Sequence, residues 1–202
     1  MIAEIRKLTN KDAAEAAILI TENIAYADEQ AKAVYGPDAL AFPGGLARQW
    51  TERDVLAMEQ YLDTSWGYFE DDRLMAVIYG TMETRRGAPW YRVIIGAIRI
   101  SAIKPEEHVA YLTKPLTVAL PDARDRFGSQ GGHAVYPPEH VRMEAYVQGF
   151  QRAKDGEQVT YDRGDGMREV FLPFLEAKDE ADFAQITAVL DRAAAQRERA
   201  GR

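Results

Sequence analysis

The feature that most constrains the fold is the stretch from Trp66 to Ile103, where three extended segments follow one another closely. Two of its runs, Leu74–Tyr79 and Val93–Ile98, are almost unbroken apolar sequences rich in Val and Ile. Such runs are typical of strands that are covered on both faces. The pair Asp71-Asp72 predicts a hairpin turn between the first two segments. The stretch therefore predicts a central sheet, with residues 91–100 as its central strand.

Helical patterns come before this sheet. Residues Ile2–Leu8 alternate as a first strand does, and the pattern Thr-x-x-Asp then occurs at Thr9 and again at Thr51, which resembles a helix capping box. After Thr9, apolar residues recur every three or four positions until Gly36. The chain thus predicts an α/β (α+β) fold, with a mixed, largely antiparallel central sheet flanked by helices.

The second half of the chain is more broken. Two prolines argue against a continuous helix over residues 104–127, and glycines and prolines predict a loop over 127–138. The segment 141–150 alternates as a strand does, and residues 159–162 and 169–175 form a last antiparallel pair. These elements complete a domain that we place at residues 1–176.

A C-terminal helix and tail, residues 177–202, follow this domain. The helix starts near Asp179, and its charged sequence carries one apolar stripe that must be buried against its own sheet or another chain. Because helices already precede the sheet, we expect peripheral docking or a homo-oligomer or assembly contact. The stripe consists of Phe183, Ile186, Leu190 and Ala194.

Composition excludes several classes of protein. The formal net charge is −7, which argues against nucleic-acid binding because phosphates require clustered Lys and Arg. The absence of cysteine excludes disulfides, thiolate metal sites and cysteine nucleophiles. The chain has no run of about 18 apolar residues and no secretory signal at its start. We therefore expect a cytoplasmic protein without a membrane span.

The order of these elements resembles the GNAT N-acetyltransferase family. The opening residues resemble its first strand and helix, Tyr68–Val77 its second and third strands, Tyr146–Phe150 its Tyr-to-Gly-Phe region, and Asp165–Leu172 its closing strand. The resemblance covers most of residues 2–175. It implies an acyl-CoA-dependent N-acyltransferase that transfers an acetyl group from acetyl-CoA to the amine of a small molecule or protein.

Two catalytic residues follow from this resemblance. Tyr146 matches the general acid that protonates the leaving thiolate, and Glu83, after the third strand, matches a base that deprotonates the amine. Each also has a structural interpretation. Tyr146 fits a strand tyrosine that packs its ring, and Glu83 fits a solvated carboxylate at a hairpin end.

The cofactor loop departs from the family. In the family, a glycine-containing loop after the fourth strand binds the pyrophosphate of acetyl-CoA. Here that strand is followed by Ile100, Ser101 and Ile103 and then by Lys104–Glu107, which contains no glycine and two carboxylates. Carboxylates at a helix N-terminus occupy the place of an anion. A glycine-rich segment with Arg124 and Arg126 offers a second candidate for the phosphates, in which Arg85 and Arg86 would join if their loops converged.

Other functions stay open. His133 and His140 flank Glu139, but no metal-binding motif is present, and we expect no metal site. One alternative is a GNAT-like interaction or assembly protein without catalysis, for example a phage or complex component, as the acidic loop suggests. Another is a cone-shaped fold of the nuclear-transport-factor type with a small-molecule pocket, which fits the early helices and late strands but not the first strand.

Overall fold

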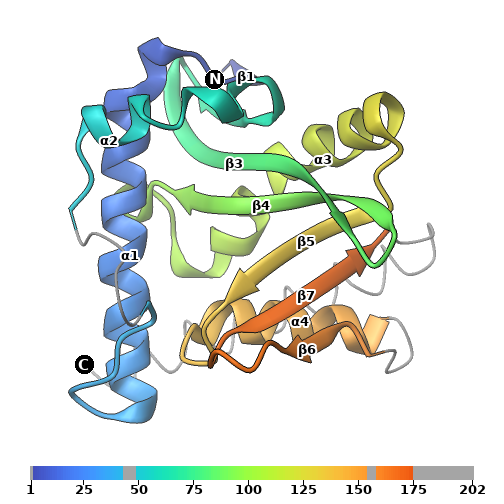
Figure 1. Cartoon of the computed structure of the whole chain (residues 1–202). Coiled ribbons are helices and arrows are strands. Elements are labelled where there is room, and N and C mark those ends of the chain that lie inside the picture. The colour runs from blue at the N-terminus through green and yellow to red at the C-terminus, as the bar shows by residue number, and fades with distance from the viewer. Residues whose placement is uncertain (1, 43–48, 154–157, 175–202) are drawn as a thin grey trace.

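The computed structural model describes residues 2–42, 49–153 and 158–174. Its centre is a seven-stranded sheet in the order β1-β2-β3-β4-β5-β7-β6 (Figure 1). Neighbouring strands are antiparallel except β4 and β5, which run parallel, so the predicted mixed, largely antiparallel sheet is confirmed. The strands are β1 (Ala3–Lys7), β2 (Trp66–Glu70), β3 (Arg73–Arg85), β4 (Ala88–Ile98), β5 (Gly131–Tyr136), β6 (Thr160–Asp162) and β7 (Arg168–Pro173).

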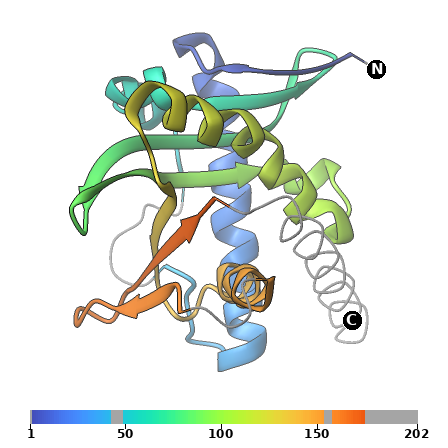
Figure 2. The same ribbon diagram turned by 90° about the vertical axis from the view of Figure 1, so that its right-hand side faces the viewer.

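Helices cover both faces of this sheet, as Figures 1 and 2 show. Side chains of α1 and α2 pack against Val77 and Tyr79 of β3, whereas α3 packs against the intervening Ile78. The period of two along a strand produces this division. The fourth helix packs against β5 and β7. The helices are α1 (Ala13–Tyr35), α2 (Glu52–Leu56), α3 (His108–Phe127) and α4 (Val141–Ala153), with 3₁₀ turns at Asn10–Asp12, Glu59–Thr64, Ile100–Ala102 and Pro105–Glu107.

Local sequence signals of the first half are confirmed. Both capping boxes form, with the backbone N–H groups of Thr9 and Thr51 each donating to the following aspartate at 2.8 Å. Helix α1 ends at Gly36, whose φ of +107° favours glycine. The pair Asp71-Asp72 has φ values of +48° and +63°, as a tight hairpin turn between β2 and β3 requires.

Helix α3 is continuous from His108 to Phe127, so the predicted interruption by proline is wrong. Each proline removes a backbone hydrogen bond and costs about 3 kcal/mol in a helix interior. Packing offsets this cost, because burying one leucine side chain contributes about 1.5–3 kcal/mol. The residues of α3 that pack against the sheet are Leu112, Leu116, Ala119, Leu120 and Ala123, and Pro115 is itself buried.

Residues 127–138, predicted as a loop, contain strand β5, so that prediction is also wrong. The glycines there allow neighbouring strands to approach each other closely. A Cβ atom at Gly131 would lie 2.2 Å from the carbonyl oxygen of Leu172 in β7, and the φ of Gly131 is +148°. The glycine signal therefore reflects the packing of β5 against β7, which local sequence does not reveal.

The segment 141–150, predicted as a strand, forms helix α4. Its apolar residues fit a spacing of three and four as well as a spacing of two. The helical spacing is the one that buries Val147 and Phe150, together with Tyr136 of β5 and Val170 of β7. A short apolar pattern cannot separate these two alternatives, and the partner that it packs against decides.

The predicted central strand is confirmed, because β4 pairs with β3 on one side and with β5 on the other. The side chains of β4 do not alternate regularly between its two faces, as a period of two would require. Val93 lies opposite Gly80 and Ile95 lies opposite Tyr79, so Ile94 is an extra residue that forms a β-bulge. Val93 packs on the side of α3, whereas Ile95 packs on the side of α1. The bulge thus reverses the faces of the strand.

Pairing between β4 and β5 ends at the same place. The described residues of the two strands pair only from Tyr91 with Gly132 to Val93 with Ala134. Beyond this point the strands diverge, and residues 95–98 of β4 keep a partner only in β3. Val93, Ile94 and Ile95 are accordingly half-buried rather than fully covered.

Several predictions lie outside the described residues. They are the turn at residues 154–157, the C-terminal helix with its apolar stripe, and the domain boundary between residues 176 and 177. The predicted antiparallel pair around residues 164–166 is confirmed as β6 and β7.

Replacing Ile98 with Asp tests the central strand. Ile98 is 2% exposed and packs with Tyr68 and Met75. An unpaired carboxylate buried there costs on the order of 4 kcal/mol or more, so we expect loss of the cooperative thermal transition in circular dichroism. The matched control Ile2→Asp changes a side chain that is 79% exposed and leaves the transition in place. An Ile98→Asp protein that melts like the parent would contradict the buried position.

Candidate functional site

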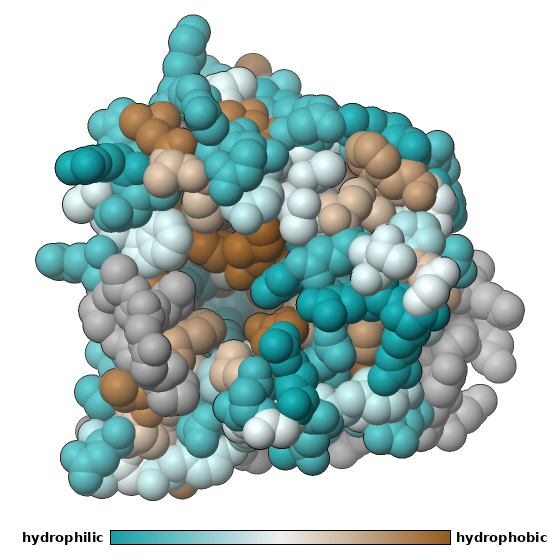
Figure 3. Space-filling view, viewed as in Figure 1, coloured by the Kyte–Doolittle hydropathy of each residue, from teal (hydrophilic) through white to brown (hydrophobic). Residues whose placement is uncertain are grey.

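The divergence of β4 and β5 opens a pocket with a volume of about 580 Å³. Residues 93–98 of β4 form one wall, and residues 132–137 of β5 and its following turn form the opposite wall. Side chains from α1, α3 and α4 close the remaining sides. Figure 3 shows a hollow on the face seen in Figure 1, bordered by hydrophobic side chains.

The lining is mostly apolar. Among the described residues that line the pocket there is no Asp or Glu, and Arg142 is the only Lys or Arg. An apolar wall with a few polar groups is typical of small-molecule and cofactor sites. The polar side chains of the lining belong to Asn23, Tyr26, His108, Thr113, His133, Tyr136, His140, Arg142 and Tyr146.

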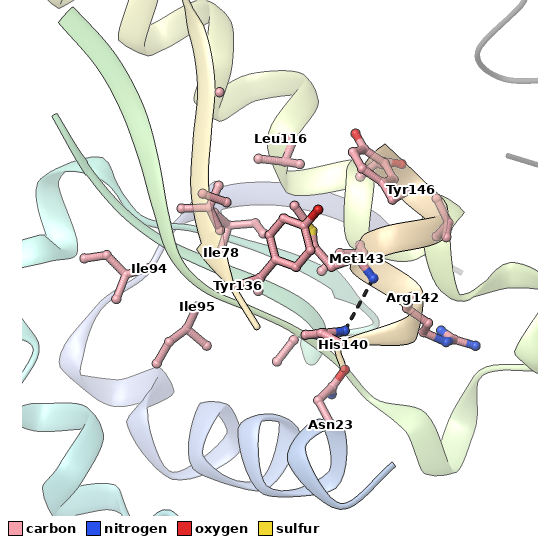
Figure 4. A pocket seen from close by; sticks show the side chains of 18 of the residues that line it. Asn23, Ile78, Ile94, Ile95, Leu116, Tyr136, His140, Arg142, Met143 and Tyr146 are labelled. Carbon is pink, nitrogen blue, oxygen red and sulfur yellow. Dashed lines mark hydrogen bonds between the residues drawn. The ribbon is translucent and has the colours of Figure 1, made fainter. Parts of the chain in front are cut away.

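Tyr146 lines this pocket from helix α4, as Figure 4 shows. Its position on a helix, rather than on the predicted strand, brings it beside the divergent strands. Burial raises the pKa of its phenol to about 12. The hydroxyl is therefore protonated at neutral pH and can donate a proton.

Two further polar residues define the pocket floor. The side-chain amide of Asn23 donates to the carbonyl oxygen of Leu19 at 2.7 Å and to that of Ile98, which fastens α1 to the end of β4. The Nδ1 atom of His140 accepts from the backbone N–H of Met143 at 3.4 Å (Figure 4). Burial lowers the pKa of His140 to about 4, so its imidazole is neutral at neutral pH.

Glu83 lies just outside the lining, with its Oε2 atom 4.0 Å from Nδ1 of His133, which lines the pocket. It is within β3 rather than after it, and it is not among the described residues that line the pocket. Its carboxylate pairs with Arg92 and with Arg85, the latter at 3.2 Å. Burial raises the pKa of Glu83, but these two arginines outweigh burial and hold the pKa below its usual value. A carboxylate stabilised in this way is a weak proton acceptor.

The predicted cofactor residues fall into two separate groups. Ile100, Ser101 and Ile103 precede α3, whereas Arg124 and Arg126 lie in its last turn. A helix of 20 residues is about 30 Å long, so the two groups do not form one site. Neither group is part of the described pocket lining.

Each member of these groups also has a structural partner. Ser101 donates from its hydroxyl to Glu22 at 2.8 Å, and Ile103 is buried in the core. Arg124 pairs with Asp125 at 3.2 Å. Arg126 pairs with Asp63 and with Asp122, the latter at 3.0 Å.

Sequence reasoning missed the contribution of α4 and its first turn. Arg142 and Met143 line the pocket, but their segment was interpreted as a strand, and His140, which also lines it, was considered only as a metal ligand. The signal that could have revealed them is Pro137-Pro138 followed by pairs four residues apart, Met143 with Val147 and Tyr146 with Phe150. Pro residues just before such a spacing are compatible with a helix start.

The described part of the chain holds neither a cluster of metal ligands nor a helix that could cross a membrane. No three of its His, Asp or Glu residues gather as a metal site. His133, which the sequence analysis considered as a metal ligand, instead forms a hydrogen bond between its Nε2 atom and the carboxylate of Glu169 at 2.9 Å. Its ring stacks on Phe171. No helix within the described ranges is long and apolar enough to cross a membrane.

Comparisons with known proteins identify the fold. No protein-family model matches the chain, and no curated protein matches it. Among solved structures, it is similar to the PaiA N-acetyltransferase of Thermoplasma acidophilum in complex with coenzyme A, with a TM-score of 0.55, 13% identity, and coverage of 84% of this chain and 99% of that chain. It is also similar to a possible acetyltransferase from Clostridium difficile 630, with a TM-score of 0.50, 16% identity, and coverage of 80% and 95%. The chain therefore has the fold of the GNAT N-acetyltransferases.

Proposed function

We propose that the chain is an acyl-CoA-dependent N-acyltransferase that transfers an acetyl group to an amine. The observation that carries this proposal is the pocket between the diverging strands β4 and β5, with the protonated Tyr146 in its wall. The GNAT fold supports it, as does the coenzyme A bound to the similar N-acetyltransferase of Thermoplasma acidophilum.

The pocket walls fit an acyl-CoA in part. Residues 94–97 of β4 have no strand partner on the side of β5, so their backbone groups can bond to the amides of an extended ligand, as an added strand would. The apolar side chains around them suit the pantetheine arm. The connection from β4 to α3, with Glu106 and Glu107, does not suit a pyrophosphate. Acetyl-CoA would supply the acetyl group as an activated thioester.

Tyr146 is the proposed general acid. Acetyl transfer forms a C–N bond and breaks a C–S bond, and the sulfur that leaves as a thiolate needs a proton. Tyr146 can donate the proton of its hydroxyl to that sulfur, because burial keeps the phenol protonated at neutral pH.

The acceptor amine enters as the neutral base. A pocket lined by no described carboxylate disfavours an ammonium ion, since burying an unpaired charge is costly. The proton that the nitrogen loses on acylation then passes to water. Glu83 stays a prediction as a base, which its absence from the described lining and its paired arginines do not favour.

A GNAT-like interaction or assembly protein is the second candidate. The acidic start of α3 favours it, because two glutamates occupy the turn where the family predicts phosphates. The third sequence-based alternative, the nuclear-transport-factor type, is wrong for this sheet, which has the GNAT fold.

Thermal stability in the presence of acetyl-CoA separates the two candidates. A ligand that binds only the folded protein stabilises it by mass action, by about 2.7 kcal/mol at 100 times its Kd. We expect millimolar acetyl-CoA to raise the melting temperature, and acetate at the same concentration to leave it unchanged. No shift with acetyl-CoA would favour the assembly protein.

Replacing Tyr146 with Phe tests the general acid. Removal of the hydroxyl should lower kcat by about 100-fold, the lower end of what a positioned acid contributes, with little change in cofactor affinity. Tyr35→Phe is the control, because Tyr35 is 56% exposed near the end of α1. Equal turnover of the parent and Tyr146→Phe proteins would remove Tyr146 from catalysis.

The raised pKa of Tyr146 gives a prediction in alkaline solution. Because the folded pKa of about 12 exceeds the ordinary value of 10, burial of the neutral phenol stabilises the fold fully below pH 10. That stability is lost as the pH rises towards 12. The difference in ultraviolet absorbance between parent and Tyr146→Phe proteins should show one phenol that is half ionised near pH 12. A midpoint near 10 in the folded protein would show that the phenol is solvated.

A further inference from the structure

The first turn of α4 contributes a cationic side chain, Arg142, to the pocket wall. Arg142 is the only Lys or Arg among the described lining residues, and in the described part of the chain it has no carboxylate partner. Its Nη2 donates to the hydroxyl oxygen of Tyr26 at 2.8 Å, and its guanidinium carbon lies 4.6 Å from the centre of that ring. Its buried Nε atom has no hydrogen-bond partner. Arg142 is thus held in place with part of its donor capacity unused.

Contacts of Tyr26 show where this arginine lies in the fold. The ring of Tyr26 meets the ring of His108, the first residue of α3, edge to face at a centroid distance of 5.3 Å. Arg142 therefore lies where α1 meets the first turns of α3 and α4. Those helices follow β4 and β5, so this is the end of the pocket at the carboxyl ends of the two parallel strands. Ligands of open α/β sheets bind outside such strand ends.

The two helix starts at this end differ in charge. Helix N-termini attract anions through their free N–H groups. The turn before α3 carries Pro105, Glu106 and Glu107, which remove one N–H group and add two negative charges. The residues before α4 include Pro137, Pro138 and one carboxylate, Glu139. Its first turn adds Arg142, and the acidic residue there, Glu144, is already paired with Arg168. Because it carries the Arg142 guanidinium, the start of α4 is the better anion site of the two.

We propose that the phosphate groups of the acyl-CoA bind at the start of α4 through Arg142, and not in the connection between β4 and α3. This inference rests on the proposed function. A guanidinium presents paired N–H donors that match phosphate oxygens. Tyr26 is the positioning residue, because its hydroxyl and ring hold the guanidinium. The half-buried position strengthens the contact, since less water screens it.

Calorimetric titration with two probes tests this assignment. Coenzyme A carries the phosphates, whereas pantetheine carries the same arm without them. Arg142→Gln should weaken coenzyme A binding by roughly 10- to 100-fold, the range of a charge-assisted contact, and leave pantetheine binding unchanged. Arg142→Lys should recover part of the loss. Arg124→Gln, at the opposite end of α3, should bind coenzyme A like the parent protein.

A second test uses the parent protein alone and therefore requires no folded variant. Inorganic pyrophosphate should compete with coenzyme A and not with pantetheine, and failure to compete would overturn the inference. Unchanged coenzyme A affinity in a folded Arg142→Gln protein would overturn it as well. A raised KM for a carboxylate-bearing acceptor with unchanged coenzyme A affinity would assign Arg142 to the acceptor instead. If the parent protein binds neither coenzyme A nor pantetheine, the proposed function itself fails.

Discussion

The end of hydrogen bonding between β4 and β5 is the constraint on which the rest of the structure depends. Two parallel strands that stop pairing leave backbone groups that need other partners. The bulge at Ile94 marks this point and turns the following residues of β4 towards α1. Separate anchors hold the walls apart: Asn23 fastens α1 to β4, and Tyr136, Glu144 and Arg168 join β5, α4 and β7. The pocket persists because each wall packs on its own support.

Features that depend on a few neighbouring residues could be predicted from the sequence. The capping box at Thr9 and the turn at Asp71-Asp72 are such features, because four residues contain all the chemistry that they need. The prolines of α3 and the glycine at position 131 could not be interpreted locally. The helix around the prolines is stabilised by its packing on the sheet. The glycine is needed because β7, distant in sequence, approaches β5 closely. The element order, which integrates many weak signals, still gave the correct fold.

The candidate site was less predictable than the fold. Tyr146 was found through its place in the element order, although its segment was assigned to the wrong secondary structure. Arg124 and Arg126 were chosen for residue type, and the length of α3 separates them from the turn that contains Ser101. Arg142 gave no signal in the sequence, because what distinguishes it is that no carboxylate lines the described pocket with it. Such an absence can be seen only when all the walls of the pocket are known.

The pairing of β4 with β5 has a mechanical consequence. Strand pairing between the sheet of β1 to β4 and the smaller group of β5, β7 and β6 is limited to three residue pairs in the described part of the chain. Near the closed end, Arg86 from the hairpin after β3 lies 3.6 Å from the ring centre of Tyr161 in β6, which ties the two groups together there. The open end has no comparable strand contact. Strand pairing therefore joins the two groups over a short length only, and a ligand in the pocket contacts both groups without breaking a strand pair.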